Sequence, residues 1–169
     1  AVLWVSVCVV LGAGLYAQAA EGSSKLLRPF GWHGGLLGGT IGILTARAWG
    51  APTLSLLAAF AIAAPWIQIL GRLRCLVQGC CHGGPTRPDV GICYHHRRSR
   101  VTQLANLAGV SIHATPLYSI AGNVLIGLFL VRLRFLAAPD SLVAGVYLLL
   151  SGIARFVEES YRAEPQTPT

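Results

Sequence analysis

Long stretches of this chain contain no Asp, Glu, Lys or Arg, and they restrict the folds that it can adopt. They cover residues 1–20, 29–46, 48–71 and 101–131. A helix needs about 20 mostly apolar residues to cross a hydrocarbon layer of roughly 30 Å. Only helices and closed β-barrels satisfy all backbone hydrogen bonds inside the hydrocarbon layer. No stretch shows the alternation of apolar and polar residues that is typical of a barrel strand. The sequence therefore predicts an all-α, polytopic transmembrane helical bundle.

Composition supports this prediction and suggests a single membrane domain over residues 1–169. Of the residues, 54% are hydrophobic and 11% are charged, whereas soluble domains carry about 25% charged residues. The chain begins with Ala, and no charged segment precedes its first apolar stretch. This pattern argues against a cleaved signal peptide and predicts that at least one upstream element is missing. The Pro- and Thr-rich tail at 163–169 is expected to fray.

The apolar pattern predicts about five spanning helices, at residues 2–20, 33–49, 53–71, 116–133 and 141–158. Pro65 is expected to kink the third helix. The connection at 72–115 is too long for a simple turn, and connections of this length are often functional. We expect it to be partly structured, with a short or re-entrant helix in "VTQLANLAGVSI".

The second predicted helix begins with "WHGGLLGG", which places small residues at every fourth position. Gly34, Gly38 and Gly42 form this row, and such rows let a neighbouring helix backbone come close. We predict a packing role for them. Packing does not require His33, which remains a candidate functional residue.

Positive charge concentrates in the connection at 72–115. The whole chain has a net charge of +7, from 13 Lys and Arg against 6 acidic residues. The connection contains one acid, Asp89, and the arginines Arg72, Arg74, Arg87, Arg97, Arg98 and Arg100. One interpretation is a cytoplasmic loop that sets topology; the other is binding of an anionic lipid headgroup, since guanidinium suits phosphate. Arg72 favours the second, because an arginine at the end of a spanning stretch usually has a partner or a function.

The same connection is rich in cysteine and histidine. It contains Cys75, Cys80, Cys81 and Cys93, together with His82, His95 and His96. A metal site, a redox dithiol or disulfide, and small buried side chains all remain open for the cysteines. Structural zinc sites use pairs spaced C-x(2–4)-C, and adjacent cysteines do not easily share one tetrahedral ion. We therefore assign no metal ligands.

Two further clusters lie near the predicted fourth and fifth helices. "HATPLY" contains His113 and Tyr118, and "ARFVEESYR" contains Arg155, Glu159 and Arg162. The last three are spaced i, i+4 and i+7, so they share one helical face. Glu158, at i+3, competes as a partner of Arg155. Both an ion-pair ladder and a functional site remain open for this cluster.

In this order, "WHGGLLGG", "GRLRCLVQGCCHGGPT", "HATPLY" and "RFVEESYRAEP" resemble the motifs of bacterial prolipoprotein diacylglyceryl transferases, over about residues 12–165. The chain departs from the family signature at Cys75, Gln78 and Cys80, where the family has Asn, Asn and Glu. The resemblance implies that the first and last family helices lie outside this sequence, as expected for a fragment. The matching positions are His33, Gly34, Gly35, Arg72, Gly79, Gly83, His113, Leu117, Tyr118, Arg155, Phe156, Glu159 and Arg162.

The resemblance implies transfer of a diacylglyceryl group from phosphatidylglycerol to the lipobox cysteine thiol of a prolipoprotein. The expected partners are phosphatidylglycerol, the lipobox peptide and membrane lipids, without nucleic acid and without a cofactor. The expected location is the bacterial cytoplasmic (inner) membrane, with the active site towards the periplasm, which conflicts with the topology interpretation of the basic connection. An alternative is a degenerate paralogue with thiol-redox or metal-binding activity through the four cysteines of the connection. A third is a non-catalytic lipid-binding protein.

The resemblance also assigns expected roles to residues. Arg72 and Arg155 are expected to hold the phosphate as charge develops, with Glu159 orienting one of them. His33 and His113 are the candidates for proton transfer, and we prefer His33 because it begins a glycine-rich helix beside the lipid. The candidate substrate-binding residues are Gly34, Gly35, Gly79, Gly83, Tyr118 and Arg162.

Overall fold

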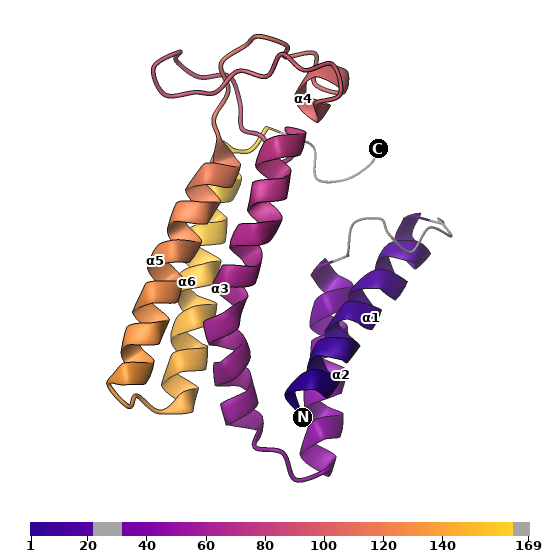
Figure 1. Ribbon diagram of the computed structural model, residues 1–169, viewed down its shortest axis with the longest axis vertical. Helices are drawn as coiled ribbons and strands as arrows, with labels where there is room; N and C mark the ends of the chain where they lie inside the picture. Colours follow the sequence, from indigo (N-terminus) through magenta and orange to yellow (C-terminus); the bar gives the residue numbers. More distant parts are fainter. Residues whose placement is uncertain (22–31, 164–169) are drawn as a thin grey trace. The chain divides into compact units, whose positions relative to one another are not determined.

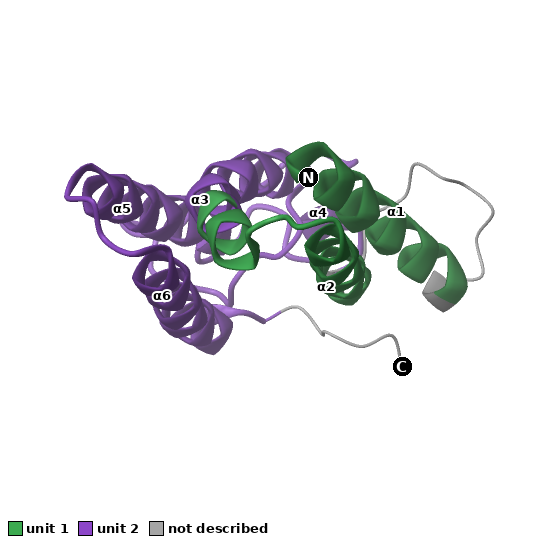
Figure 2. Cartoon of the chain, turned by 90° about the horizontal axis from the view of Figure 1, so that it is seen from below, with its two compact units in different colours: residues 1–59 green, residues 60–169 purple. Residues whose placement is uncertain are grey.

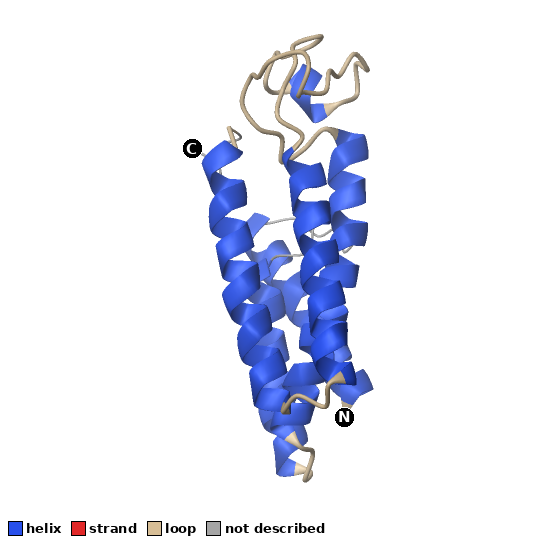
Figure 3. Cartoon of the chain, turned by 90° about the vertical axis from the view of Figure 1, so that its left-hand side faces the viewer, coloured by secondary structure: helices blue, strands red, loops and turns tan. Residues whose placement is uncertain are grey.

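The computed structural model describes residues 1–21 and 32–163. Within these ranges the regular secondary structure is helical, and no β-strand is present (Figure 3). Residues 164–169 of the tail expected to fray lie outside the described residues. The predicted all-α class is confirmed. The helices, labelled in Figure 1, are α1 (Val2–Glu21), α2 (Trp32–Ala48), α3 (Thr53–Gln78), α4 (Arg100–Gln103), α5 (Thr115–Phe135) and α6 (Asp140–Tyr161).

Among the described residues, α1, α3, α5 and α6 are long and apolar enough to cross a membrane by length and composition. The second predicted span, α2, is shorter at 17 residues. Large apolar side chains point outward on the long helices; Leu3, Leu125 and Leu148 are 78%, 69% and 68% exposed. Such surfaces are rare on soluble monomers and suit contact with lipid. The chain is a multi-pass membrane protein.

The third helix is longer than the sequence predicted. It continues through Pro65 and past residue 71 as far as Gln78, so the connection begins at Gly79. Gly79 adopts φ +67°, and the Cys80 N–H donates to the Cys75 carbonyl at 3.2 Å. These are the features of a Schellman helix end with glycine at the C′ position. The prediction ended the helix before its first arginine, but a charged side chain does not stop a helix when it has a partner, and Arg72 pairs with Glu158 at 2.9 Å.

The chain divides into two compact units, residues 1–59 and 60–169 (Figure 2). In the first unit, α1 and α2 contact each other through their backbones. A Cβ added to Gly38 would overlap the Cys8 carbonyl, and one added to Gly34 would overlap the Gly12 carbonyl. A Cβ on Gly42 would lie 2.9 Å from the Cβ of Cys8. The predicted packing role of this glycine row is confirmed.

In the second unit, α3, α5 and α6 lie side by side (Figures 1 and 3). A Cβ on Gly127 of α5 would lie 2.9 Å from the Trp66 ring of α3, so this ring packs directly against the backbone of α5. Gln68 of α3 donates to the Tyr147 hydroxyl of α6 at 2.8 Å. The connection that begins at Gly79 lies at one end of the three helices, with the single-turn α4 as its helical part (Figure 1).

Gly38→Ala is predicted to destabilise the protein, because its Cβ would occupy the space of the Cys8 carbonyl. Overpacking of this kind costs about 1–3 kcal/mol. Gly145→Ala is the matched control: a Cβ there would meet nothing within 4 Å, and Ala is favoured over Gly in a helix. Thermal unfolding in detergent checks both variants, and equal midpoints would contradict the packing interpretation.

Candidate functional site

A cavity of about 560 Å³ lies among the helices of the second unit. It brings together Arg72, Arg155, His113 and Tyr118, which the sequence had singled out from three separate motifs. Apolar groups such as Ile126, Ala154 and Val157 complete its walls. The further polar and charged residues that line it are Gln68, Ser119, Asn123, Ser151, Glu158 and Tyr161.

Glu158 joins the two arginines of the cavity. Its carboxylate oxygens lie 2.9 and 3.1 Å from Nη2 of Arg72, and Oε1 lies 3.3 Å from Nη1 of Arg155. The Glu158 side chain is 6% exposed and that of Arg72 is 19% exposed. A buried carboxylate therefore holds guanidinium groups from α3 and α6 at one place. The sequence had treated Glu158 only as a competing partner of Arg155, so it missed this residue as part of the site.

A second carboxylate extends this cluster towards the end of α6. Oε2 of Glu159 lies 3.0 Å from Nη2 of Arg155 and 3.3 Å from Nη1 of Arg162. These ion pairs are the ladder that the sequence left open as one of two interpretations, although Arg162 follows α6 in extended backbone and does not continue its face. Together with Arg72 and Glu158, these ion pairs link three guanidinium groups to two carboxylates among the described residues.

His113 lies in an aromatic group at the cavity wall. Its Nδ1 is 3.1 Å from the Tyr118 hydroxyl, and its ring centroid is 5.3 Å from that of Tyr161. Backbone hydrogen bonds fix its position. The Gly83 N–H donates to the His113 carbonyl at 3.0 Å, and the His113 N–H donates to the Gly84 carbonyl at 2.9 Å. A Cβ on Gly83 would lie 2.5 Å from that of His113, so this close approach requires glycine.

Other predicted site residues lie elsewhere. His33 belongs to the first unit, where its ring centroid is 5.9 Å from that of Tyr16. Gly34 and Gly35 lie on α2 facing α1, and Gly79 ends α3. Gly34 and Gly35 thus serve helix packing, and Gly79 serves the end of α3. The substrate-binding roles of these glycines stay predictions.

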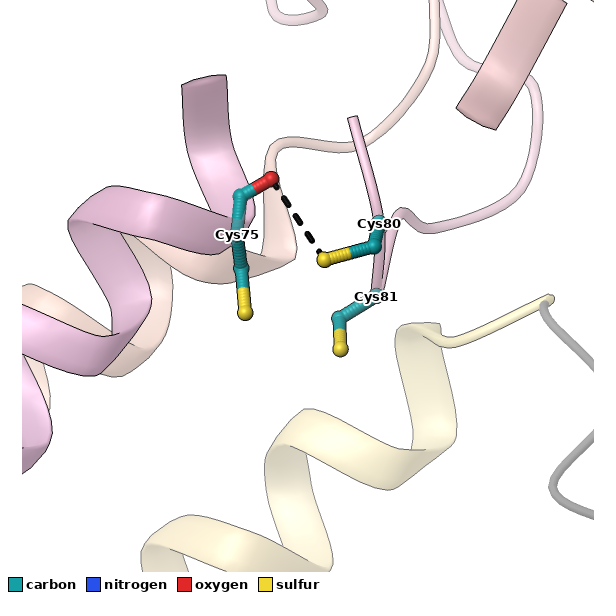
Figure 4. Close-up of side chains that lie close together, drawn as sticks. All are labelled: Cys75, Cys80 and Cys81. Atoms are coloured by element: carbon teal, nitrogen blue, oxygen red, sulfur yellow. Dashed lines mark hydrogen bonds between the residues drawn. The ribbon is translucent and has the colours of Figure 1, made fainter. Parts of the chain in front are cut away.

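Three of the cysteines of the basic connection form a cluster. The sulfur atoms of Cys75, Cys80 and Cys81 all lie within 4.8 Å of one another (Figure 4). The pKa of Cys81 is lowered, because Cys75 and Cys80 donate hydrogen bonds to its sulfur and nearby arginines favour the thiolate. The pKa of Cys80 is raised, because its hydrogen bonds with Cys75 and Cys81, and its burial, favour the thiol. Cys93 is exposed and is not part of this group.

Comparison with known proteins gives a consistent result. A family model described as prolipoprotein diacylglyceryl transferase matches residues 2–168. A phosphatidylglycerol–prolipoprotein diacylglyceryl transferase of Clostridium tetani is 24% identical over 135 residues, which cover 79% of this chain and 52% of the relative. The corresponding transferase 2 of Clostridium perfringens is 29% identical over 150 residues, which cover 85% of this chain and 56% of the relative. The chain thus spans about half the length of these curated relatives.

Glu158→Gln is predicted to lower the free energy of unfolding by about 2 kcal/mol. Removing one partner of a fully buried ion pair costs about 3–5 kcal/mol, and the loss is smaller here because the Arg72 side chain is 19% exposed. Glu159→Gln is the matched control; its side chain is 40% exposed, so a loss below about 1 kcal/mol is expected. Unfolding of both variants in detergent measures the difference, and equal losses would show that Glu158 is not the central partner.

Proposed function

Because this chain belongs to the prolipoprotein diacylglyceryl transferase family, we propose that it transfers a diacylglyceryl group from phosphatidylglycerol to the lipobox cysteine thiol of a prolipoprotein. The names of its relatives contain both the donor and the acceptor. The proposed location is the bacterial inner membrane, with the cavity towards the periplasm, where the lipobox substrate would meet it. The basic connection would then attract anionic lipid rather than set a cytoplasmic topology.

The shared cavity of Arg72 and Arg155 is the observation that carries this proposal. The leaving group of the reaction is glycerol phosphate, an anion whose charge develops as the carbon–oxygen bond breaks. A guanidinium has five N–H donors, so each arginine can keep its bond to Glu158 and still donate to phosphate. Donors held in place in a cavity with apolar walls stabilise such charge more than water does.

The reaction also requires a nucleophile. The lipobox thiol must lose its proton, and a free cysteine has a pKa of about 8.5. The thiolate then attacks the glyceryl carbon, a thioether forms, and the carbon–oxygen bond breaks with its electron pair leaving on glycerol phosphate. We assign the thiol proton to His113, whose ring lines the cavity, with Tyr118 positioning that ring through the 3.1 Å contact.

This assignment makes His113, rather than His33, the preferred acceptor of the thiol proton. The sequence favoured His33, but His113 shares the cavity with both arginines. His33 stays a second candidate for proton transfer. Glu159 and Arg162 are proposed to hold Arg155 in position from the end of α6, since Glu159 contacts both arginines.

Transfer of labelled diacylglycerol from phosphatidylglycerol to a lipobox peptide tests the proposal. Arg72→Ala and Arg155→Ala are each predicted to reduce the transfer rate about 10²–10³-fold, the usual cost of losing one group that stabilises developing charge. Arg132→Ala, an exposed arginine in the last turn of α5, is the control and should retain the wild-type rate. Absence of transfer by the wild type, with a family control active in the same vesicles, would contradict the proposal.

A second comparison separates the histidines. His113→Ala is predicted to lower kcat by about 10²–10⁴-fold, the usual contribution of general acid–base catalysis. His33→Ala should have a much smaller effect if His113 accepts the proton. The same transfer assay at saturating phosphatidylglycerol measures both, and the reverse order of effects would return the role to His33.

A further inference from the structure

The three clustered sulfurs come from two adjoining pieces of chain. Cys75 lies in the last turn of α3, and Cys80 and Cys81 follow directly after Gly79, which ends the helix. None of the three forms a disulfide, and their side chains lie close together in Figure 4. None of the three cysteines lines the cavity to which the proposed transfer is assigned.

The backbone explains how two adjacent cysteines can face one point. Side chains of neighbouring residues in extended chain point to opposite sides, but Cys81 adopts φ +56°, a conformation that is uncommon for residues other than glycine. The Thr115 hydroxyl donates to the Cys81 carbonyl, and the Cys80 N–H donates to the Cys75 carbonyl at 3.2 Å. These bonds hold the unusual turn in place. Strained backbone of this kind concentrates at functional sites.

The spacing of the sulfurs suits a metal ion. An ion at about 2.3 Å from each of three thiolates, the zinc–sulfur distance, requires sulfur–sulfur separations of about 4.0 Å. The present separations are all within 4.8 Å, so small side-chain rotations are enough. A disulfide would need two sulfurs at about 2.05 Å and would leave the third cysteine unused. Cys80 is buried while Cys75 and Cys81 are half-buried, which leaves a route for an ion to enter.

The donor set indicates which ion. Among the described residues, the group contains three sulfurs and no histidine or carboxylate. Structural zinc sites almost always have four protein ligands, whereas soft thiolate ligands also select Cu(I).

We propose that Cys75, Cys80 and Cys81 bind one Cu(I) ion through their three sulfur atoms. Binding releases the thiol protons to solvent as thiolate–copper bonds form, and neither copper nor sulfur changes oxidation state. The sequence-based objection that adjacent cysteines do not easily share an ion does not hold for this backbone, because the turn at Cys81 brings both sulfurs to one side. The site is independent of the proposed transferase chemistry.

Anaerobic titration of the full 169-residue chain in detergent with Cu(I), against a chromophoric Cu(I) chelator, tests the proposal. The wild type should bind one Cu(I), and X-ray absorption should show only sulfur neighbours. Single changes Cys75→Ser, Cys80→Ser and Cys81→Ser should each weaken binding by at least about 100-fold, since even second-layer partners of metal sites contribute about 10–100-fold. Cys93→Ser and Cys8→Ser are the matched controls and should bind as the wild type does.

Circular dichroism of each variant identifies any loss of helix, so that weaker binding is scored only for folded protein. Three results would overturn the proposal. The first is undiminished Cu(I) binding by a folded variant that lacks all three cysteines. The second is that Cys93→Ser weakens Cu(I) binding as much as the changes in the cluster do. The third is that the same three cysteines bind Zn²⁺ more tightly than Cu(I). Transferase activity is not a readout, so failure here leaves the proposed function standing.

Discussion

The carboxylate of Glu158 is the contact on which the second unit depends. It pairs with Arg72 at 2.9 Å and with Arg155 at 3.3 Å, and these arginines lie on helices far apart in the sequence. An arginine inside a membrane helix is costly unless it has a partner, and Arg72 and Arg155 both lie within helices long enough to span. The buried carboxylate lowers this cost for both residues. It also holds α6 against α3, where Gln68 and Tyr147 make a second polar contact.

The same contact connects stability with the proposed chemistry. If each arginine were fully neutralised by its own carboxylate, an anionic headgroup would gain little in the cavity. Instead, Arg72 and Arg155 share the carboxylate of Glu158. The guanidinium groups keep N–H donors beyond those used by this carboxylate. The arrangement that makes the arginines tolerable near lipid thus leaves N–H donors for the phosphate of the proposed substrate.

The charge-free stretches were enough to predict the helix class and the approximate positions of α1, α3, α5 and α6, because the hydrocarbon layer imposes length and polarity on any span. The end of α3 was predicted too early, since arginine alone does not stop a helix and the stop at Gly79 depends on a positive φ. The order of motifs pointed to Arg72, Arg155 and His113, which share the cavity. Glu158 was missed because the sequence alone does not show whether Glu158 (i+3) or Glu159 (i+4) is the main partner of Arg155. Only the position of α3 shows that Glu158 also contacts Arg72.

The cysteine cluster shows why residues can change within a preserved backbone. Gly79 ends α3 with φ +67°, and Gly83 permits the close approach to His113, so these two glycines fix the path of the chain on either side of residues 80–82. Side chains between them can then vary without moving His113 away from the cavity. No sequence pattern indicated that Cys80 and Cys81 would face Cys75, because that depends on the local turn at Cys81. The two proposed activities, anion binding at Arg72 and metal binding through the sulfur of Cys75, therefore use side chains one helical turn apart at one end of α3.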